Sequence, residues 1–554
     1  MHSPNLIERQ VIELLNNKKY AEASETASSL TASHPLRIVS SGLKMLHVDH
    51  LYDQASAKLR RAHKQLGNDP FIVSSLADAL KRSGDPQKAI ALLRDTLRSL
   101  KNHPELEVKL SFLLFDSGEL EKAFELLNQS KHRNLKSHIN ARGFLHFKKE
   151  SFQDALEAYQ QLTLLAPKDP EAFFNLGCSY LRLKQFKRAE TALDTSRSIG
   201  FKRLPELFSN LGIAIEEQNR PQEAAAYFLE CIKLAGVKNV PDDAYHLSLI
   251  YLRTGKLREG FNLYDARFSR SGTRVHNPPP NIPWWDGKTT TGHLLLWSEQ
   301  GIGDQVLYTR TFSWLRNFFS GSIDCVIEGR LVETFRTHFP SINFIQSTEV
   351  GPEKYDFHLP TGSIPRILIE NEGEATWLQT NKSNNTSPFT NIKKRTSKKL
   401  RIGISWFSSN KELGAKNIDP ETFGHILNSI HGDKELTNLQ YDADPNDLAV
   451  ISSVTQLPIL RAEAENKRDI SGIMDVISNL DLVVSISNTT VHLSGLSNIP
   501  TLLLASKYSG RLWYWEQLSS DSMSLWYPSV AVISQATEGD WKSVIPTVEE
   551  LINE

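Results

Sequence analysis

The sequence predicts an all-α array of repeated helix pairs followed by an α/β region that folds as two doubly wound lobes. Two observations lead to this order. Small residues recur about every 34 positions through the first half of the chain, a spacing typical of repeats built from helix pairs. After Arg270 this spacing ends, and short β-branched and apolar runs alternate with amphipathic segments, as in parallel sheets covered by helices.

The repeat is clearest in one small residue of each unit. These anchor residues are Ala21, Ala55, Ala89, Ala123, Ala155, Ala189, Ala224 and Gly260. A small residue at a helix crossing lets the two helices approach closely. The pattern resembles the tetratricopeptide repeat, and it implies about eight repeats over residues 1–270 that stack into a superhelix. Such arrays bind proteins or peptides far more often than they catalyse reactions, so we expect a protein partner.

Two asparagines occupy equivalent places in neighbouring repeats. Asn175 and Asn210 each stand one residue before a Leu-Gly pair in the first helix of a unit. An asparagine there could hydrogen-bond the backbone of an extended acceptor peptide on the concave face. Packing between repeats, or simple solvation, is the alternative.

Bulk composition excludes several classes of function. The 554 residues carry a net charge of −1, which does not favour nucleic acid or an anionic membrane as a partner. The three cysteines, Cys178, Cys231 and Cys325, predict neither a disulfide framework nor a zinc site. The N-terminal residues lack the apolar core of a signal peptide, and no apolar run is long enough to span a bilayer. We therefore expect a cytoplasmic protein.

The second half of the chain divides at two polar segments. Residues 271–292 are rich in proline and glycine and read as a connector, and residues 381–399 are polar and read as a linker. The sequence thus predicts one lobe over residues 293–380 and a second over residues 400–554. Strands are expected at residues 293–297, 323–329, 342–347, 355–360, 401–406, 436–441, 458–463, 481–487, 500–505 and 529–534. Ligands of doubly wound sheets bind at the carboxyl ends of strands, and the pair of lobes resembles the GT-B architecture of glycosyltransferases.

The stretch "SEQGIGDQ" (298–305) joins the first strand of this region to a helix that we expect to begin near Gln305. Gly301 and Gly303 let the chain turn and present backbone N–H groups to a ligand. Asp304 then stands at the start of the helix. Two roles stay open for it: an N-cap that accepts N–H bonds from Val306 or Leu307, and a general base that faces the cleft.

A second helix start follows the apolar strand "DLVVSIS". Asn488 is a natural N-cap, and the N–H groups and hydroxyls of Thr489 and Thr490 come directly after it. A helix N-terminus of this kind suits a nucleotide diphosphate. His492 lies in the first turn and could reach a phosphate or sugar, or it could pack between helix and sheet.

The third candidate segment is "GISWFSSNKELGAKNIDPETF" (403–423). A strand ends at Trp406, and a loop with Lys411 and Lys416 follows. Lysines above the carboxyl end of a strand can neutralise a pyrophosphate leaving group, with surface lysines as the plain alternative. We expect Trp406 and Lys411 to contact the donor. The acidic pattern "DAD" at 442–444 matches a short metal motif by chance too easily, so no metal site is predicted there.

Taken together, three segments of the second half of the chain resemble a known family. "WSEQGIGDQVLYTRTF", "VSISNTTVHLSGLSNIPTLLL" and "SLWYPSVAVISQATEGDW" resemble bacterial proteins in which tetratricopeptide repeats are fused to a heptosyltransferase-like glycosyltransferase domain. The resemblance implies a GT-B fold, a nucleotide-sugar donor in the C-terminal lobe and no metal. It implies that Asp304 is the base and that Thr489, Thr490 and His492 lie at the donor phosphates. Heptosyltransferases have an Asp at the position where this chain has Asn488.

Our leading hypothesis is a glycosyltransferase that moves a sugar from a nucleotide donor to a Ser or Thr hydroxyl of a protein. Some repeat-fused transferases of this kind glycosylate flagellin. Asp304 would deprotonate the acceptor, and the helix start at 488–492 with Lys411 would stabilise the leaving diphosphate. A saccharide or lipid acceptor is the first alternative, and deletion of residues 1–260 should leave such an enzyme active on a small acceptor. A non-catalytic scaffold that senses nucleotide sugar is the second. Trp513, Tyr514 and Trp515 could stack on a base or sugar, or pack the lobe edge.

Overall fold

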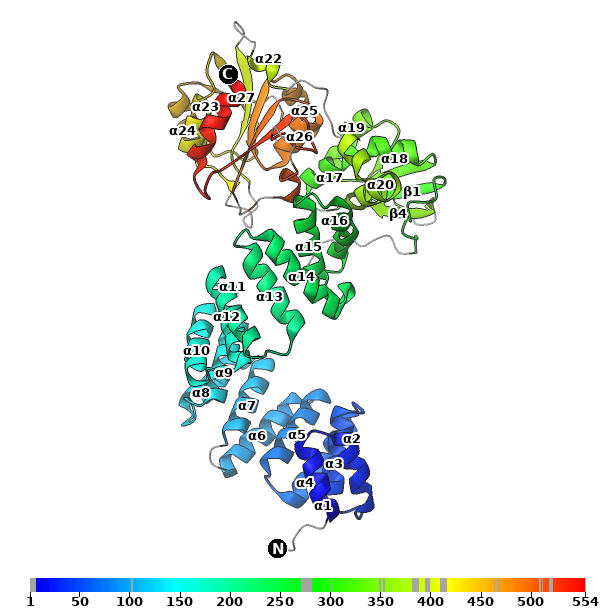
Figure 1. Cartoon of the computed structure of the whole chain (residues 1–554), viewed down its shortest axis with the longest axis vertical. Coiled ribbons are helices and arrows are strands. Elements are labelled where there is room, and N and C mark those ends of the chain that lie inside the picture. The colour runs from blue at the N-terminus through cyan, green and yellow to red at the C-terminus, as the bar shows by residue number, and fades with distance from the viewer. Residues whose placement is uncertain are drawn as a thin grey trace. The chain divides into compact units, whose positions relative to one another are not determined.

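A computed structural model describes residues 6–100, 103–270, 281–299, 301–347, 350–351, 354–380, 388–393, 399–408, 416–462, 464–465, 468–507, 510, 512–517 and 522–553. The chain forms two compact units, Met1–Gln218 and Asn219–Glu554. Figure 1 shows the helices and strands of both units, with labels on those for which there is room. Within the described residues, no helix is both long and apolar enough to cross a bilayer.

The first unit consists of helix pairs. Its helices are α1 (Leu6–Asn16), α2 (Tyr20–Thr26), α3 (Pro35–His47), α4 (Tyr52–Leu66), α5 (Pro70–Arg82), α6 (Pro86–Leu100), α7 (Pro104–Asp116), α8 (Leu120–Gln129), α9 (Lys136–Lys148), α10 (Phe152–Leu165), α11 (Pro170–Arg182), α12 (Phe186–Ser198) and α13 (Leu204–Glu216). Several of them start on a proline, whose fixed φ suits the first helical position. Each helix of a pair packs on the other and on the next pair.

The small anchor residues occupy the helix crossings as predicted, with one correction. From Ala55 onward every anchor is buried, and each is the fourth residue of the second helix in its pair. In the first pair that place belongs to Ala23, which is fully buried, whereas the predicted anchor Ala21 is exposed. The anchor follows the start of α2 at Tyr20, and the spacing between the first two repeats is therefore shorter than predicted.

A glycine in the first helix of a pair serves the same close approach. A Cβ at Gly177 would lie 2.6 Å from Cγ of Leu193 on the facing helix. Any larger residue there would force the two helices apart. Cys178 beside it is partly buried, and Cys231 is fully buried; both pack within helices, and burial raises the pKa of Cys178 to about 12.

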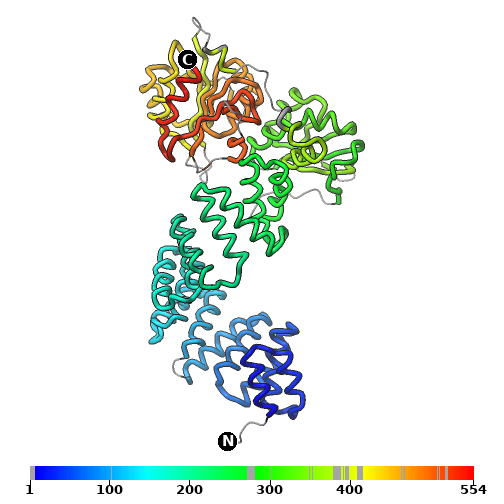
Figure 2. The backbone as a smooth tube through the Cα atoms, in the orientation of Figure 1, coloured from blue at the N-terminus to red at the C-terminus, as the bar shows by residue number. Residues whose placement is uncertain are grey.

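The second unit begins with the last repeat helices and continues into the α/β region. These helices are α14 (Pro221–Ala235), α15 (Pro241–Arg253) and α16 (Leu257–Tyr264), followed by the 3₁₀ helix η3 (Asp265–Phe268). Helix α15 packs against the 3₁₀ helix η9 (Trp513–Trp515), and α16 packs against α20 (Ile364–Glu372). The last repeat thus contacts elements from both α/β lobes (Figure 2).

The first lobe is built on a four-stranded parallel sheet in the order β3-β2-β1-β4. Its strands are β1 (His293–Trp297), β2 (Ser322–Val326), β3 (Asn343–Ile345) and β4 (Phe357–Pro360). Its helices are α17 (Ile302–Tyr308), α18 (Phe312–Phe318), α19 (Gly329–His338), α20 and α21 (Glu374–Thr380). The neighbour on each side of β1 is a later strand, so the carboxyl end of β1 lies where the strand order reverses, which is where doubly wound sheets bind ligands.

The second lobe is built on a six-stranded parallel sheet in the order β10-β9-β8-β5-β6-β7. Its strands are β5 (Leu400–Ser405), β6 (Lys434–Asn438), β7 (Ile459–Arg461), β8 (Leu482–Ile486), β9 (Thr501–Ala505) and β10 (Val530–Ser534). Its helices are α22 (Thr390–Lys393), α23 (Pro420–Asn428), α24 (Pro445–Thr455), α25 (Ile470–Ser478), α26 (Thr489–Leu496) and α27 (Ile545–Ile552). This is the doubly wound strand order 3-2-1-4-5-6, and its switch point lies between β5 and β8.

Every predicted strand is present in the described part of the chain, although most are shorter than predicted. Successive residues of the second sheet face different cores. Val483 packs in a core shared with α25, both lobes and the last repeat, whereas Val484 packs in a second core with α23, α24 and α27. Because both faces are covered, these strands read as continuous apolar runs. The α/β interpretation is confirmed at the level of two parallel sheets.

Candidate active site

The glycine loop places Asp304 in the first turn of α17 rather than at its cap. The helix begins at Ile302, with Gly301 as the N-cap residue. The prediction that it begins near Gln305 is wrong, and so is the prediction that Asp304 accepts N–H bonds from later residues. Its Oδ2 instead accepts a hydrogen bond of 3.3 Å from the backbone N–H of Gly301, three residues earlier in the chain. The carboxylate therefore stabilises the loop that carries it, and remains partly exposed.

The surroundings of Asp304 make it a weaker acid. Burial, with a smaller contribution from the charge of Glu299, raises the pKa of Asp304 to about 6. The Gly301 N–H group and the charge of Lys416 act in the opposite direction. A carboxylate that titrates near neutral pH is well matched to general base catalysis.

The Asn488 turn lies at the switch point of the second sheet. Asn488 is the N-cap of α26, as predicted, and its Oδ1 accepts the N–H of Thr490 at 3.0 Å. Its Nδ2 donates to the hydroxyl of Ser405 at 2.7 Å and to the carbonyl of Phe407 at 3.3 Å. The side chain thus joins the carboxyl end of β8 to that of β5. Thr489 is partly exposed, whereas Thr490 is buried.

Lys416 lies close enough to Asp304 and His492 for its charge to act on both. The side chain is only 5% exposed, and among the described residues it has no hydrogen-bond or ion-pair partner. Burial lowers the pKa of Lys416 to about 8, and the nearby Asp304 carboxylate partly opposes that shift. A buried amine without a fixed partner is costly unless an anion binds there. The other predicted lysine, Lys411, lies outside the described residues.

His492 is buried rather than exposed to a donor. Its side chain is 2% exposed, and its Nδ1 lies 3.1 Å from the hydroxyl of Tyr527. Burial, with a smaller contribution from Lys416, lowers the pKa of His492 to about 3, which keeps the imidazole neutral. Its position favours the packed alternative that the sequence left open over direct donor contact.

Trp406 is also placed in the interior. The indole is 1% exposed and lies beside the ring of Phe423 beneath the β5 end. The predicted donor contact by its ring is therefore not supported. Trp513, Tyr514 and Trp515 are buried as well. Trp513 packs against Phe261 and Trp515 against His492, which favours the packing alternative over stacking on a ligand.

The two loops from the two lobes lie next to each other because α17 packs on α26. A Cβ at Gly303 would lie 2.8 Å from Cδ2 of His492, so the glycine is needed for this approach. The glycine loop and the Asn488 turn, far apart in sequence, form one site.

We expect Gly303→Ala to lower the free energy of unfolding by about 1–3 kcal/mol and to displace Asp304, because the His492 ring is buried among other side chains and cannot move aside. Gly301→Ala is the matched control, since a Cβ there would meet only Asp304 Oδ2, at 3.7 Å. Urea denaturation of both variants measures the difference. Equal losses of stability would contradict the packing argument.

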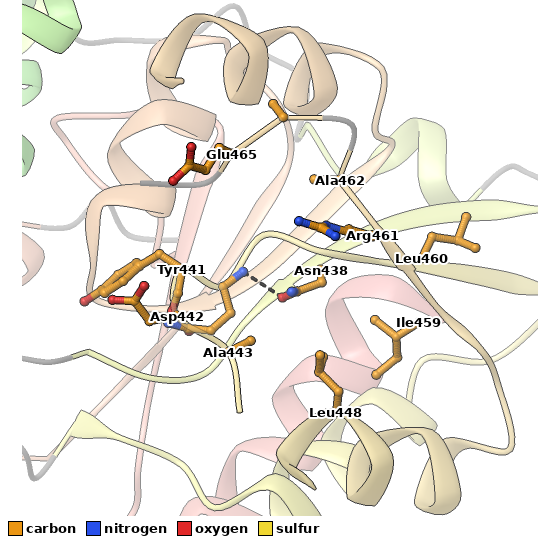
Figure 3. A pocket seen from close by; sticks show the side chains of 12 residues that line it. Asn438, Tyr441, Asp442, Ala443, Leu448, Ile459, Leu460, Arg461, Ala462 and Glu465 are labelled. Carbon is orange, nitrogen blue, oxygen red and sulfur yellow. Dashed lines mark hydrogen bonds between the residues drawn. The ribbon is translucent and has the colours of Figure 1, made fainter. Parts of the chain in front are cut away.

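A cavity of about 340 Å³ lies beside this site, at the carboxyl ends of β6 and β7. The side chains of Asp442, Arg461 and Glu465 surround it, together with Asn438, Tyr441 and apolar residues (Figure 3). Asp444 of the acidic pattern is the N-cap of α24. This cavity was not predicted from the sequence, although the carboxyl ends of the two strands expected at residues 436–441 and 458–463 were available as a signal.

Asn175 and Asn210 lie in the first unit, on α11 and α13, and both are partly exposed. The amide of Asn210 donates to the carbonyl of Glu206 in its own helix at 2.8 Å. This bond uses one of the two N–H groups of the amide. The two roles predicted for these residues stay open.

The comparisons with known proteins bear on the repeats. A tetratricopeptide-repeat family model matches residues 140–199, which confirms the repeat assignment there. Protein FlbA of Caulobacter vibrioides is 22% identical over 325 residues, which are 54% of this chain and 53% of FlbA. The chain thus spans about half the length of this relative.

Two solved structures are also similar. One is the APC/C hetero-tetramer Cut9–Hcn1, with 17% identity, a TM-score of 0.36 and coverage of 43% of this chain and 47% of that chain. The other is a tetratricopeptide repeat protein from Parabacteroides merdae, with 12% identity, a TM-score of 0.35 and coverage of 44% and 97%.

Proposed function

We propose that the second unit is a glycosyltransferase of GT-B type that moves a sugar from a nucleotide-sugar donor to a Ser or Thr hydroxyl of a protein bound by the repeats. One observation carries the proposal. A carboxylate that titrates near neutral pH, Asp304, lies near the buried amine of Lys416, which has no partner within the described ranges, and near the amino end of α26, all at the strand switch points. A base and an anion site side by side are the requirements for substituting a phosphate leaving group.

The chemistry assigns each group one task. Asp304 accepts the proton of the acceptor hydroxyl while the oxygen of that hydroxyl forms a bond to C1 of the sugar. The bond from C1 to the phosphate oxygen breaks, and the electron pair leaves with the nucleoside diphosphate. Lys416 and the amino end of α26 stabilise the charge that develops there.

The donor fits the second lobe in one orientation. The Asn488 side chain already bonds the N–H of Thr490, so the first-turn amides of Thr489 and Val491 are the ones that a phosphate would meet. The nucleoside would then extend into the cavity at the ends of β6 and β7. An uncharged Asn at the cap suits an anionic ligand better than an acid would.

The pH dependence of transfer follows from two shifted pKa values. Asp304 must be ionised to act as base, so kcat/KM should rise with pH through about 6. Lys416 must be protonated to bind phosphate, so kcat/KM should fall above about 8. In Lys416→Met the alkaline limb should vanish, the donor KM should rise, and the acid limb should move to higher pH, because a charge that lowers the Asp304 pKa is gone. A profile that is flat from about pH 5 to 9 would contradict both assignments.

The direct test is transfer with purified protein. A panel of UDP-, GDP- and ADP-sugars is incubated with candidate acceptors, flagellin among them, and intact-mass spectrometry detects the added sugar. Transfer to a protein that requires the first unit supports the proposal. Donor hydrolysis or transfer only to saccharides favours the saccharide acceptor, and donor binding without any turnover favours the scaffold.

The structure shows that a different deletion is needed to distinguish a protein acceptor from a saccharide acceptor. Removing residues 1–260 would take away Leu252 and Leu257, which belong to the core shared by both lobes. The cut belongs before Asn219, where the second compact unit begins.

A further inference from the structure

We propose that Arg267, from the 3₁₀ helix that ends the last repeat, is a positioning residue for Asp304. The proposal rests on the glycosyltransferase function argued above. It assigns the last repeat a part in the catalytic machinery, through an ion pair with Glu299 in the loop between β1 and α17.

The ion pair joins two segments that are separate in sequence and function. Arg267 Nε donates to Glu299 Oε2 at 2.7 Å, and Nη2 donates to Oε1 at 2.6 Å. Both side chains are 1% exposed. This bidentate geometry fixes the direction of the carboxylate as well as its distance. Burial alone would lower the pKa of Arg267, but Glu299 and Asp265 outweigh burial and hold it well above its usual value.

The guanidinium is held on every side. The rings of Tyr264 and Phe268 each lie 4.2 Å from it. Its Nη1 donates to Asp265 at 2.8 Å, and its Nη2 also donates to the Ser363 hydroxyl at 3.0 Å. A Cβ at Gly362 would lie 2.9 Å from Glu299 Oε1, so the chain leaves room there for the pair.

A second contact holds α17 further along. The hydroxyls of Tyr264 and Tyr308 lie 2.8 Å apart, and both side chains are buried. Tyr308 is four residues after Asp304, on the same face of the helix. Glu299 is five residues before Asp304. The last repeat therefore fixes the segment that carries the base at one point on each side of it.

Stability alone gives little reason for such a pair. A buried ion pair often stabilises a fold no more than apolar residues of similar size, because both charges lose their hydration. Its directional bonds do more for the geometry of the loop. Glu299 also places a negative charge near Asp304, which helps to raise the pKa of Asp304.

The test replaces both charges at once. In the double variant Arg267→Met with Glu299→Gln, both members of the buried ion pair become uncharged. Neither is left as an unpaired buried charge, so the protein should still fold. Arg267→Lys is the second variant, since it keeps the charge and loses the bidentate bonds. Arg401→Met is the matched control, because Arg401 forms a bidentate pair with Asp481 at the amino end of β5, away from the site.

Four quantities are measured on the full chain: melting temperature, calorimetric affinity for UDP, GDP and ADP, kcat, and the pH of the acid limb. The double variant should keep its melting temperature and nucleotide affinity, lose about ten- to a hundredfold in kcat, and shift the acid limb to lower pH, because Glu299 no longer raises the Asp304 pKa. Arg267→Lys should have a lower kcat but an acid limb at the wild-type pH. Arg401→Met should keep both the wild-type kcat and the wild-type pH of the acid limb.

The proposal is overturned if the double variant, or Arg267→Lys where the double variant does not fold, keeps the wild-type kcat. It is also overturned if nucleotide affinity and melting temperature fall in step with kcat. If the wild type transfers no sugar at all, the proposed function fails first. The effect on Asp304 is then read from the pH above which the stabilisation by Asp304→Asn stops growing. That pH follows the native pKa of Asp304, so it should lie lower, and the stabilisation should be smaller, when Asp304→Asn is made in the double variant.

Discussion

Asp304→Asn is expected to abolish transfer and at the same time to stabilise the protein at pH 8. Loss of a general base costs about 10²- to 10⁴-fold in rate. The stabilisation follows from linkage: the native pKa is about 6, above the ordinary value of 3.8, so the native state holds this proton more tightly than the unfolded chain does. The free energy of unfolding therefore falls as pH rises from about 4 to about 6 and stays lowered above that. Asparagine avoids this cost, which we put at about 1–2 kcal/mol after allowing for partial exposure.

Urea denaturation at pH 5 and pH 8, together with a transfer assay, measures both effects. The gain in stability should be larger at pH 8. Asn can still accept the Gly301 N–H bond through its Oδ1, so the loop should persist and nucleotide binding should remain. If the variant is less stable than the wild type at pH 8, the side chain has a structural role in place of the catalytic one.

A chain that begins at Asn219 is expected to fold, whereas a chain that begins at residue 271 is not. The second cut removes Phe261 and Tyr264, both 1% exposed and packed against Trp513 in the core of the lobes. Loss of one such ring typically costs about 3–5 kcal/mol. It also leaves Glu299 buried without Arg267, at a further cost of about 3–5 kcal/mol. The sum matches or exceeds the whole stability of an ordinary domain.

Circular dichroism melting and size-exclusion chromatography of the two fragments check this result. The 219–554 fragment should melt cooperatively, and the shorter one should aggregate or lack a transition. Cooperative melting of both would show that the last repeat is dispensable for the lobes, and the account of the shared core would be wrong.

The repeats and the sheets were predictable because their signals are periodic. A small residue in the fourth place of a helix and a run of apolar residues in a covered strand each reflect one packing contact, repeated along the chain. The error at Ala21 arose because the sequence gives only the spacing between small residues, whereas the start of α2 decides which of them lies at the crossing. Ala21 and Ala23 are both alanines, so the sequence alone did not distinguish them.

The helix start at Asn488 was predictable, but the start of α17 and the contacts across the lobes were not. Asn488 followed from its type and its place after a strand. The burial of His492 and Trp406 depends on side chains such as Tyr527 and Phe423, which are distant in sequence. The pairing of Arg267 with Glu299 had no signal in either local segment, because only the fold brings them together.

The central claim is that a diphosphate binds between Lys416 and the first turn of α26, next to Asp304. A crystal structure of Asp304→Asn with the nucleoside diphosphate that raises its melting temperature most tests it directly. The account predicts phosphate density within hydrogen-bond distance of the amides of Thr489 and Val491 and of the Lys416 amine, with the base in the cavity at the ends of β6 and β7. Density at any other place on the chain, with this turn empty, would contradict it.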